Sequence, residues 1–192
     1  MILEGIVTSI SAAGAVNIAP MGPIVDAAMR HIVLRPFASA DTFRNLRDHP
    51  EGVLHVSDDV LLLARAAVGK VEPAPPMFAA ERVKGWVLAD ACRYHEFRVV
   101  SIDDREERVR IDADVVHSGR LRDFFGFNRA KHAVVEAAIL ATRTALLPAD
   151  EIAADFRKLK VIVMKTGGAV EHEAFAFLED YVARQPRLFP ES

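Results

Sequence analysis

The chain has 192 residues, of which 51% are hydrophobic and 27% charged, and its net charge is −3. This length and hydrophobic content suit one large domain, or one domain with an appended region, and allow a substantial buried core. The weakly acidic balance argues against DNA or RNA as the main partner, because phosphate backbones are bound by concentrated cationic surfaces.

Three sequence features bear on where the protein resides. The longest apolar stretches, such as VLLLARAAV, are interrupted by Arg65 and are too short to span a bilayer. The segment MILEGIVTSIS carries Glu4 and lacks the basic start of a signal peptide. The single cysteine, Cys92, excludes an internal disulfide framework and fits a reducing compartment. We therefore expect a cytoplasmic protein with no membrane partner.

The first part of the chain predicts mainly strands. ILEGIVTSIS alternates apolar and polar residues, and GAVNIAPMG follows it after a glycine turn, so these two segments are expected to form a hairpin. HIVLRPF and GVLHVSDD have the composition of further strands. The expected strands of this part cover residues 2–11, 14–22, 31–37 and 52–59.

Two short helices are expected between these strands. SADTFRNLRDHP predicts the first, with Ser39 or Asp41 as its N-cap and Pro50 as its end. DVLLLARAAVG predicts the second, with Asp58 or Asp59 as its N-cap. The proline-rich segment VEPAPPMFAAERV has no periodicity and is expected to be irregular.

Strand patterns return between Gly85 and Gly119, joined by the charged turn DDREE. In RVRIDADVV, apolar residues alternate with charged ones, which is typical of a half-exposed antiparallel strand. The alternating apolar residues are Val109, Ile111, Ala113 and Val115.

Helical patterns dominate after Gly119. NRAKHAVVEAAILATRTALL has apolar residues at helical spacing as far as Ala145, and Pro148 is expected to end this helix. ADEIAADFRKL predicts a short helix, KVIVMKTGG an extended segment, and VEHEAFAFLEDYVARQ a closing helix. The sequence therefore predicts a mainly β protein of the α+β class, with an antiparallel β body over 1–119 and a helical region over 120–192.

Common catalytic and metal-binding motifs are missing from the sequence. It contains no glycine-rich phosphate loop followed by lysine, no GxGxxG and no GxSxG. Its seven histidines form no HxH or HxxxH pair, so no metal site is expected.

One loop has the composition of a phosphate site. A strand delivers Arg35 to its end, and Ser39 and Thr42 follow where a helix begins. A guanidinium group, two hydroxyls and the free amides of a helix start suit a phosphate. The alternative is structural: Ser39 caps the helix, Arg35 pairs with Asp41, and Thr42 is solvated.

The segment NIAPMG offers a bare and stiff backbone near this loop. A flat aromatic ligand lying against a strand edge needs few bulky side chains in its way, and Asn17 supplies a polar group. The alternative is a bent edge strand whose prolines only block aggregation.

Four charged or titratable residues share one face of the helix expected after residue 127. They form either a surface that faces a substrate or a ladder of ion pairs along the helix. These residues are Arg129, His132, Glu136 and Arg143.

Taken in order, NIAPMG, VLRPFASADTFRNL, GVLHVSDDVLLLARAAVG and GFNRAKHAVVEAAILATR resemble the domain-of-unknown-function 447 proteins. That family belongs to the flavin-reductase-like FMN-binding split barrels, and the resemblance covers residues 3 to 180. It implies a split β-barrel with an appended C-terminal helical region, which dimerises and binds FMN in a groove between subunits.

The resemblance also implies which residues contact the cofactor. It places the flavin ring beside Asn17, Ile18, Ala19 and Pro20, and the phosphate near Arg35, Ser39 and Thr42, with Asn45 close by. His55 stands where relatives often carry asparagine, and Phe43 where they commonly carry tyrosine. Arg129, Lys131 and His132 are expected to form a family-specific substrate pocket.

Three functions remain open at this point. The first is an FMN-dependent oxidoreductase with a nicotinamide or another small-molecule redox partner. The second is a non-enzymatic FMN carrier, store or redox sensor, and the third a barrel that has lost its flavin. Fold alone does not decide among them.

Overall fold

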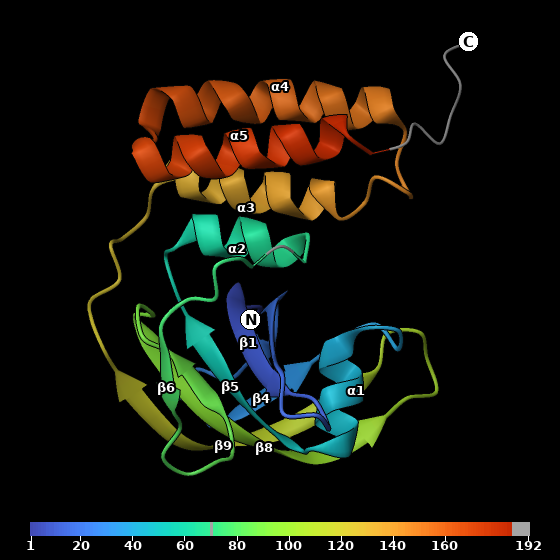
Figure 1. The fold of residues 1–192 in the computed structure, drawn as a ribbon, viewed down its shortest axis with the longest axis vertical. Coiled ribbons are helices and arrows are strands. Elements are labelled where there is room, and N and C mark those ends of the chain that lie inside the picture. The colour runs from blue at the N-terminus through green and yellow to red at the C-terminus, as the bar shows by residue number, and fades with distance from the viewer. Residues whose placement is uncertain (70, 186–192) are drawn as a thin grey trace. The chain divides into compact units, whose positions relative to one another are not determined.

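Figure 1 shows the computed structural model of the chain, which describes residues 1–69 and 71–185. The chain divides into two compact units. The first unit comprises residues 1–58 and 72–124, and the second comprises residues 59–71 and 125–192. The division expected at residue 119 stays a prediction, and residues 60–67 pack with the C-terminal helices.

The first unit is built around a curled antiparallel sheet (Figure 1). Its seven strands lie in the order β2-β1-β5-β8-β9-β4-β3, so that the predicted N-terminal hairpin forms one edge. The strands are β1 (Gly5–Ile10), β2 (Val16–Met21), β3 (Ile24–Val25), β4 (His31–Leu34), β5 (Glu51–Val56), β8 (Arg93–Asp103) and β9 (Arg110–Arg120).

The alternation predicted for β9 is present. Ile111 and Ala113 are fully buried, whereas Arg110 and Asp114 are exposed. Such a pattern places one face of the strand on the core and the other in solvent. The core cluster combines β1, β3, β4, β5, β8, β9 and the helix α1 (Asp41–Asp48), and its larger members are Ile32, Leu34, Phe43, Leu46, Leu54, Phe97 and Ile111.

Helix α1 differs from the prediction at its start. Its N-cap is Ala40, and no side chain caps the helix, so neither Ser39 nor Asp41 has that role. The Arg44 side chain bonds both the Ser39 main-chain oxygen and the Asp41 carboxylate. Asp41 is therefore held by the helix's own arginine rather than by Arg35.

The segment expected to be irregular, residues 71–83, contains a strand. β6 (Met77–Ala79) pairs with β7 (Trp86–Leu88) in a separate two-stranded sheet. Strands of three residues are too short to show a hydrophobic periodicity in the sequence. A two-stranded hairpin on its own is also only marginally stable. Contacts with the main sheet, made by the buried side chains described below, hold this hairpin.

The described residues of the second unit form four helices, each packed on at least two of the others. They are α2 (Val60–Ala67), α3 (Arg129–Ala141), α4 (Ala149–Thr166) and α5 (Ala169–Ala183). Asp59 caps α2 by accepting hydrogen bonds from the main-chain N–H groups of Leu61 and Leu62, both at 3.0 Å. Of the two residues predicted as the N-cap of this helix, Asp58 and Asp59, the structure confirms Asp59.

The extended segment predicted for residues 160–168 is wrong, because α4 continues to Thr166. The run VIV has high β propensity, but Ile152, Phe156 and Val163 lie on one helical face and are buried. Phe156 packs against Phe175 of α5, with ring centroids 5.5 Å apart. Helix packing therefore overrides local propensity, and the helix ends at Gly167.

Helix α3 is shorter than predicted. It ends at Ala141, and turns follow as far as Leu146, so Ala145 is exposed and lies outside the helix. Arg143 also lies beyond the last helical residue. Among the residues that the structure describes, no helix combines the length and apolarity needed to cross a bilayer.

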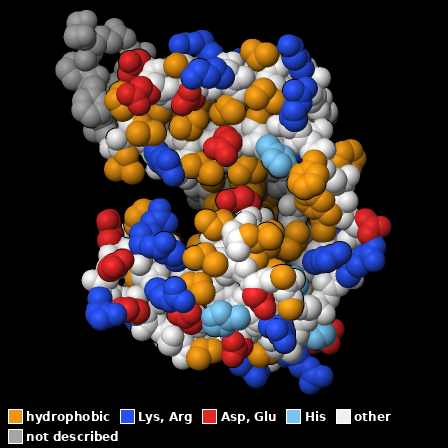
Figure 2. Space-filling model, turned by 180° about the vertical axis from the view of Figure 1, so that it is seen from behind, with side chains coloured by type: hydrophobic (Ala, Val, Ile, Leu, Met, Phe, Trp, Pro, Cys, Tyr) orange, Lys and Arg blue, Asp and Glu red, His pale blue; other side chains and the backbone are white. Residues whose placement is uncertain are grey.

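Acidic and basic side chains are interspersed on the face of the molecule shown in Figure 2. Such mixing agrees with the small net charge of −3.

Candidate functional site

The predicted ring and phosphate residues meet where β2 lies beside the first turn of α1. The Asn17 side-chain N–H of β2 donates to the Thr42 hydroxyl at 3.1 Å. Asn17 is half-buried, whereas Thr42 is almost fully buried. This bond joins the segment NIAPMG directly to the segment expected to bind phosphate.

The residues of the edge strand β2 are partly exposed to solvent. Ile18, Ala19 and Pro20 pair with Thr8, Val7 and Ile6 of β1, and all three β2 residues are half-buried. Because β2 is the last strand of its sheet, its outer edge is free of strand partners in the described structure. Pro20 has no main-chain N–H to offer at this edge.

The loop from β4 to α1 carries two unpaired polar side chains. Arg35 and Ser39 are exposed, and neither side chain has a hydrogen-bond or ion-pair partner among residues 1–69 and 71–185. The helix that follows has no side-chain cap. Free main-chain N–H groups at a helix start attract anions, and a guanidinium group strengthens that attraction.

A second guanidinium group supports this loop. Arg108 donates to the main-chain oxygen of Arg35 at 3.2 Å, and its Cζ lies 3.8 Å from the centroid of the Phe37 ring. Phe37 and Arg108 also form an isolated β-bridge. Sequence reasoning missed Arg108, because 73 residues separate it from Arg35.

His55, predicted to contact the cofactor, has both ring nitrogens bonded to main chain. It is fully buried, with Nδ1 3.1 Å from the oxygen of Ile6. Its Nε2 accepts a hydrogen bond from the N–H of Leu88 at 3.0 Å, so Nδ1 carries the proton and donates. Burial lowers the pKa of His55 to about 4. This histidine anchors the β6–β7 hairpin, and we leave it out of the site proposed below.

Two family models match the chain. The one described as the N-terminal domain of a protein of unknown function (DUF447) matches residues 3–122, and the DUF447 C-terminal model matches residues 128–180. The chain belongs to the DUF447 family. This confirms the resemblance found in the sequence. A comparison with curated proteins finds no match.

Solved structures confirm the fold of this DUF447 chain. An FMN-bound DUF447 protein from Methanosarcina mazei is 21% identical, has a TM-score of 0.82, and matches over 94% of both chains. A 2-nitrobenzoate 2-nitroreductase from Pseudomonas fluorescens is 16% identical with a TM-score of 0.52, over 61% of this chain and 64% of that one. An NADH:FAD oxidoreductase from Streptomyces globisporus is 11% identical with a TM-score of 0.52, over 62% and 75%. The first unit is thus a flavin-reductase-like split barrel.

The residues predicted for a substrate pocket of the DUF447 chain lie in the second unit. Lys131 forms an ion pair with Glu171 at 2.8 Å, and both side chains are largely buried. Arg129 and His132 are exposed at the start of α3, and the His132 ring lies 6.0 Å from that of Phe127.

The predicted ladder is not formed within the described part of the chain, since no ion pair joins Arg129, His132, Glu136 and Arg143. A pocket at Arg129, Lys131 and His132 stays a prediction.

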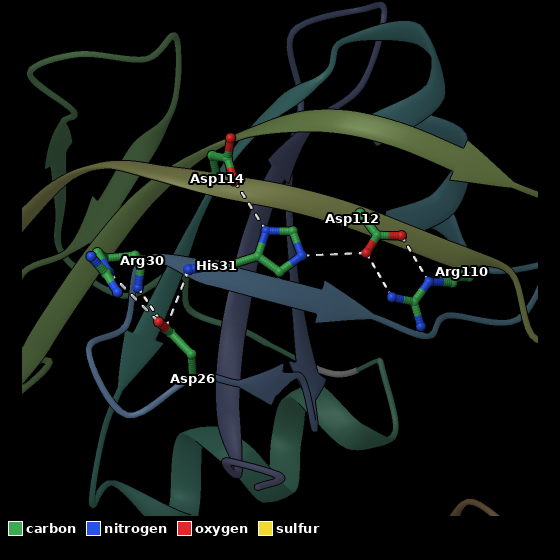
Figure 3. Close-up of polar contacts among 6 residues, drawn as sticks. All are labelled: Asp26, Arg30, His31, Arg110, Asp112 and Asp114. Carbon is green, nitrogen blue, oxygen red and sulfur yellow. Dashed lines mark hydrogen bonds and ion pairs between the residues drawn. The ribbon is translucent and has the colours of Figure 1, made fainter.

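A separate polar cluster lies on the exposed face of β4 and β9 (Figure 3). The His31 ring lies between two carboxylates of β9, with Nδ1 3.0 Å from Asp114 and Nε2 3.3 Å from Asp112. Arg110 donates two hydrogen bonds to Asp112, at 2.7 and 2.8 Å. Asp26 accepts hydrogen bonds from the main-chain N–H groups of Arg30 and His31. In the described residues, no three His, Cys, Asp or Glu side chains are placed to hold a metal ion.

We expect His31 to titrate above its usual pKa of 6.5, because its hydrogen bond to Asp114 favours the protonated ring, and Asp112 adds to this. A raised pKa in the folded state means that His31 stabilises the protein below pH 6.5 and that this stabilisation is lost as the pH rises through the raised value. An NMR titration of the imidazole protons tests this. Asp114→Asn is expected to lower the midpoint, and an unchanged midpoint would contradict the assignment.

Proposed function

We propose that this chain binds FMN in the barrel unit and acts as a flavin-dependent oxidoreductase on a small molecule that remains to be identified. The FMN-bound Methanosarcina relative supports the cofactor. The nitroreductase and the NADH:FAD oxidoreductase that share the fold support redox chemistry. When bound, FMN supplies hydride transfer, and the protein positions the cofactor and controls access to it.

The observation that carries this proposal is the hydrogen bond between Asn17 and Thr42. It joins β2 to the uncapped start of α1, and the unpaired Arg35 lies in the loop that leads into this helix. One surface thereby offers a strand edge for a flat ring and a cationic loop for a phosphate. FMN has this combination of a planar ring and a terminal phosphate, so the residues present fit the group.

The roles of individual residues follow from their exposure and partners. Arg35 and Ser39 would hold the phosphate, with the free N–H groups of α1. Asn17, Ile18, Ala19 and Pro20 would face the ring. Asn45 and Thr42 are buried and bond neighbouring side chains, so we assign them to orienting the site rather than to direct phosphate contact.

We also propose a homodimer with FMN in a groove between the subunits, as the family resemblance implies. Two-fold dimers are the commonest homo-oligomers. Light scattering during size-exclusion chromatography measures the molecular mass of the protein. A monomer that is saturated with FMN would contradict the dimer.

The deciding experiment is an absorption spectrum of the freshly purified protein, followed by heat release and identification of any yellow compound. Flavin bands near ~450 nm and FMN in the supernatant would support the cofactor. Anaerobic titration with NADH and NADPH then separates an enzyme from a carrier, because only the former is bleached at a useful rate. A colourless protein that does not take up added FMN would contradict the proposal.

We predict that Arg35→Ala weakens FMN binding about tenfold or more and leaves riboflavin binding almost unchanged, because riboflavin lacks the phosphate. Fluorescence quenching titrations with both ligands measure the two dissociation constants. Arg47→Ala is the matched control, since Arg47 lies in the last turn of α1, the helix that follows the Arg35 loop, and pairs with Asp48. Equal losses for both ligands would place Arg35 away from the phosphate.

A further inference from the structure

Four polar side chains of β1, β2 and α1 form a hydrogen-bonded network at the edge of the sheet. The Asn17 side chain donates to the Thr42 hydroxyl at 3.1 Å and, more weakly, to the Ser9 hydroxyl at 3.5 Å. The Asn45 side chain donates to the same Ser9 hydroxyl at 3.1 Å. These bonds connect β1, β2 and α1.

Burial differs sharply across this network. Ser9 is 1% exposed, Thr42 is 2% exposed and Asn45 is 7% exposed, whereas Asn17 is half-buried. Every buried side-chain nitrogen or oxygen of the described residues has a hydrogen-bond partner. No partner is present among these residues for the Asn17 Oδ1. That oxygen is therefore accessible from outside.

In the structure, the network turns the oxygen end of the Asn17 amide outward. Both amide hydrogens point inward, toward the acceptors Thr42 and Ser9, because an amide nitrogen carries two donors and no free acceptor. A reversed amide would instead accept hydrogen bonds from the two hydroxyls and turn its NH2 group outward, so the two orientations present opposite groups to a ligand. Asn45 donates to the same Ser9 hydroxyl and so fills one of its two acceptor positions.

We infer that Ser9 and Asn45 are positioning residues, which together with Thr42 hold the Asn17 amide so that Oδ1 accepts a hydrogen bond from an N–H of the bound ring. This inference rests on the proposed binding of FMN. The oxidised isoalloxazine ring carries a single N–H, at N3, between two carbonyl groups. An outward amide oxygen matches this donor, whereas an outward NH2 group would match the carbonyls instead.

The experiment compares the binding of FMN with that of 3-methyl-FMN, in which the N3 hydrogen is replaced by a methyl group. We expect the unchanged protein to bind FMN about tenfold more tightly than the methyl analogue, the usual effect of one hydrogen bond and its geometry. In Ser9→Ala and Thr42→Val this ratio should fall toward one, because the amide is then free to reverse. Asn17→Leu should abolish the preference altogether.

The matched control is Ser11→Ala. Ser11 lies in the same hairpin, and its hydroxyl accepts from the main-chain N–H of Ala15 rather than from the network. This variant should keep the tenfold ratio. Because the readout is a ratio of two affinities for one variant, a general loss of stability or of phosphate binding does not change it.

The outcomes separate this inference from the proposed function. A ratio near one in the unchanged protein, or an unchanged ratio in both Ser9→Ala and Thr42→Val, would overturn the inference while FMN binding stands. Failure of the unchanged protein to bind FMN at all would overturn the proposed function itself. If Ser9→Ala does not fold, Thr42→Val decides, because valine has the shape of threonine without its hydroxyl.

Discussion

Replacing Glu96 by alanine is expected to lower the free energy of unfolding by about 3–5 kcal/mol. Glu96 is fully buried in β8, and its carboxylate accepts hydrogen bonds from three consecutive main-chain N–H groups of the β6–β7 loop. The donors are Glu81, Arg82 and Val83, at 2.8, 2.6 and 3.1 Å. Alanine would leave these groups without an acceptor and a void in the core. Urea-induced unfolding measures the change.

Glu51→Ala is the control for this prediction. Glu51 accepts a hydrogen bond from the N–H of Lys84 in the same loop and pairs with Arg98, but its side chain is 20% exposed. Water replaces such contacts more readily, so we expect a loss of about 1 kcal/mol. Similar losses for the two variants would show that the buried carboxylate is no stronger an anchor than the exposed one.

Glu96 is one of three buried polar side chains that tie the hairpin to the sheet. Thr8 of β1 donates its hydroxyl to the oxygen of Trp86 at 2.6 Å, and His55 of β5 accepts from Leu88. With Glu96 of β8, the three come from adjacent strands. The hairpin is therefore held through its main chain as well as through the buried side chains of Val87 and Leu88.

This arrangement explains which parts of the fold the sequence predicts. The β1–β2 hairpin and β9 are found because their apolar residues alternate, and Asp59 is found because a carboxylate before an apolar run caps a helix. β7 falls within the strand pattern that begins at Gly85. β6 is missed because it is held by pairing with β7 and by the hairpin's bonds to Thr8, His55 and Glu96, which are distant in sequence. No local pattern reports such contacts.

The same distinction between local and long-range signals applies to the candidate site. Arg35 and Asn17 are predicted from the sequence because a cation before a helix start and an amide in a bare strand are local signals. Ser9 is missed because a polar residue in a strand normally faces solvent, and only the pairing of β1 with β2 and the packing of α1 bury it. The sequence also predicts Asn45 near the phosphate, and we propose its orienting role because its side chain bonds Ser9.

The pH dependence of stability provides the second large expected effect. Burial lowers the pKa of His55 to about 4 from 6.5, so the unfolded chain binds the proton more tightly than the folded one. Stability therefore falls as the pH drops from about 6.5 to about 4, and the contribution of His55 amounts to roughly 3 kcal/mol. Below pH 4 the residue is protonated in both states and contributes no further change.

The comparison of the unchanged protein with His55→Asn isolates this effect. Asparagine keeps a donor for the oxygen of Ile6 but does not titrate, so its free energy of unfolding should decline less between pH 6.5 and pH 4. His95 is also buried, and burial lowers its pKa, so some dependence of the same sign remains in the variant. Urea unfolding at pH 4, 5, 6 and 7 measures both curves. Parallel curves would show that His55 is protonated within the folded barrel at little cost, and that its bond to Leu88 is not what holds the hairpin in place.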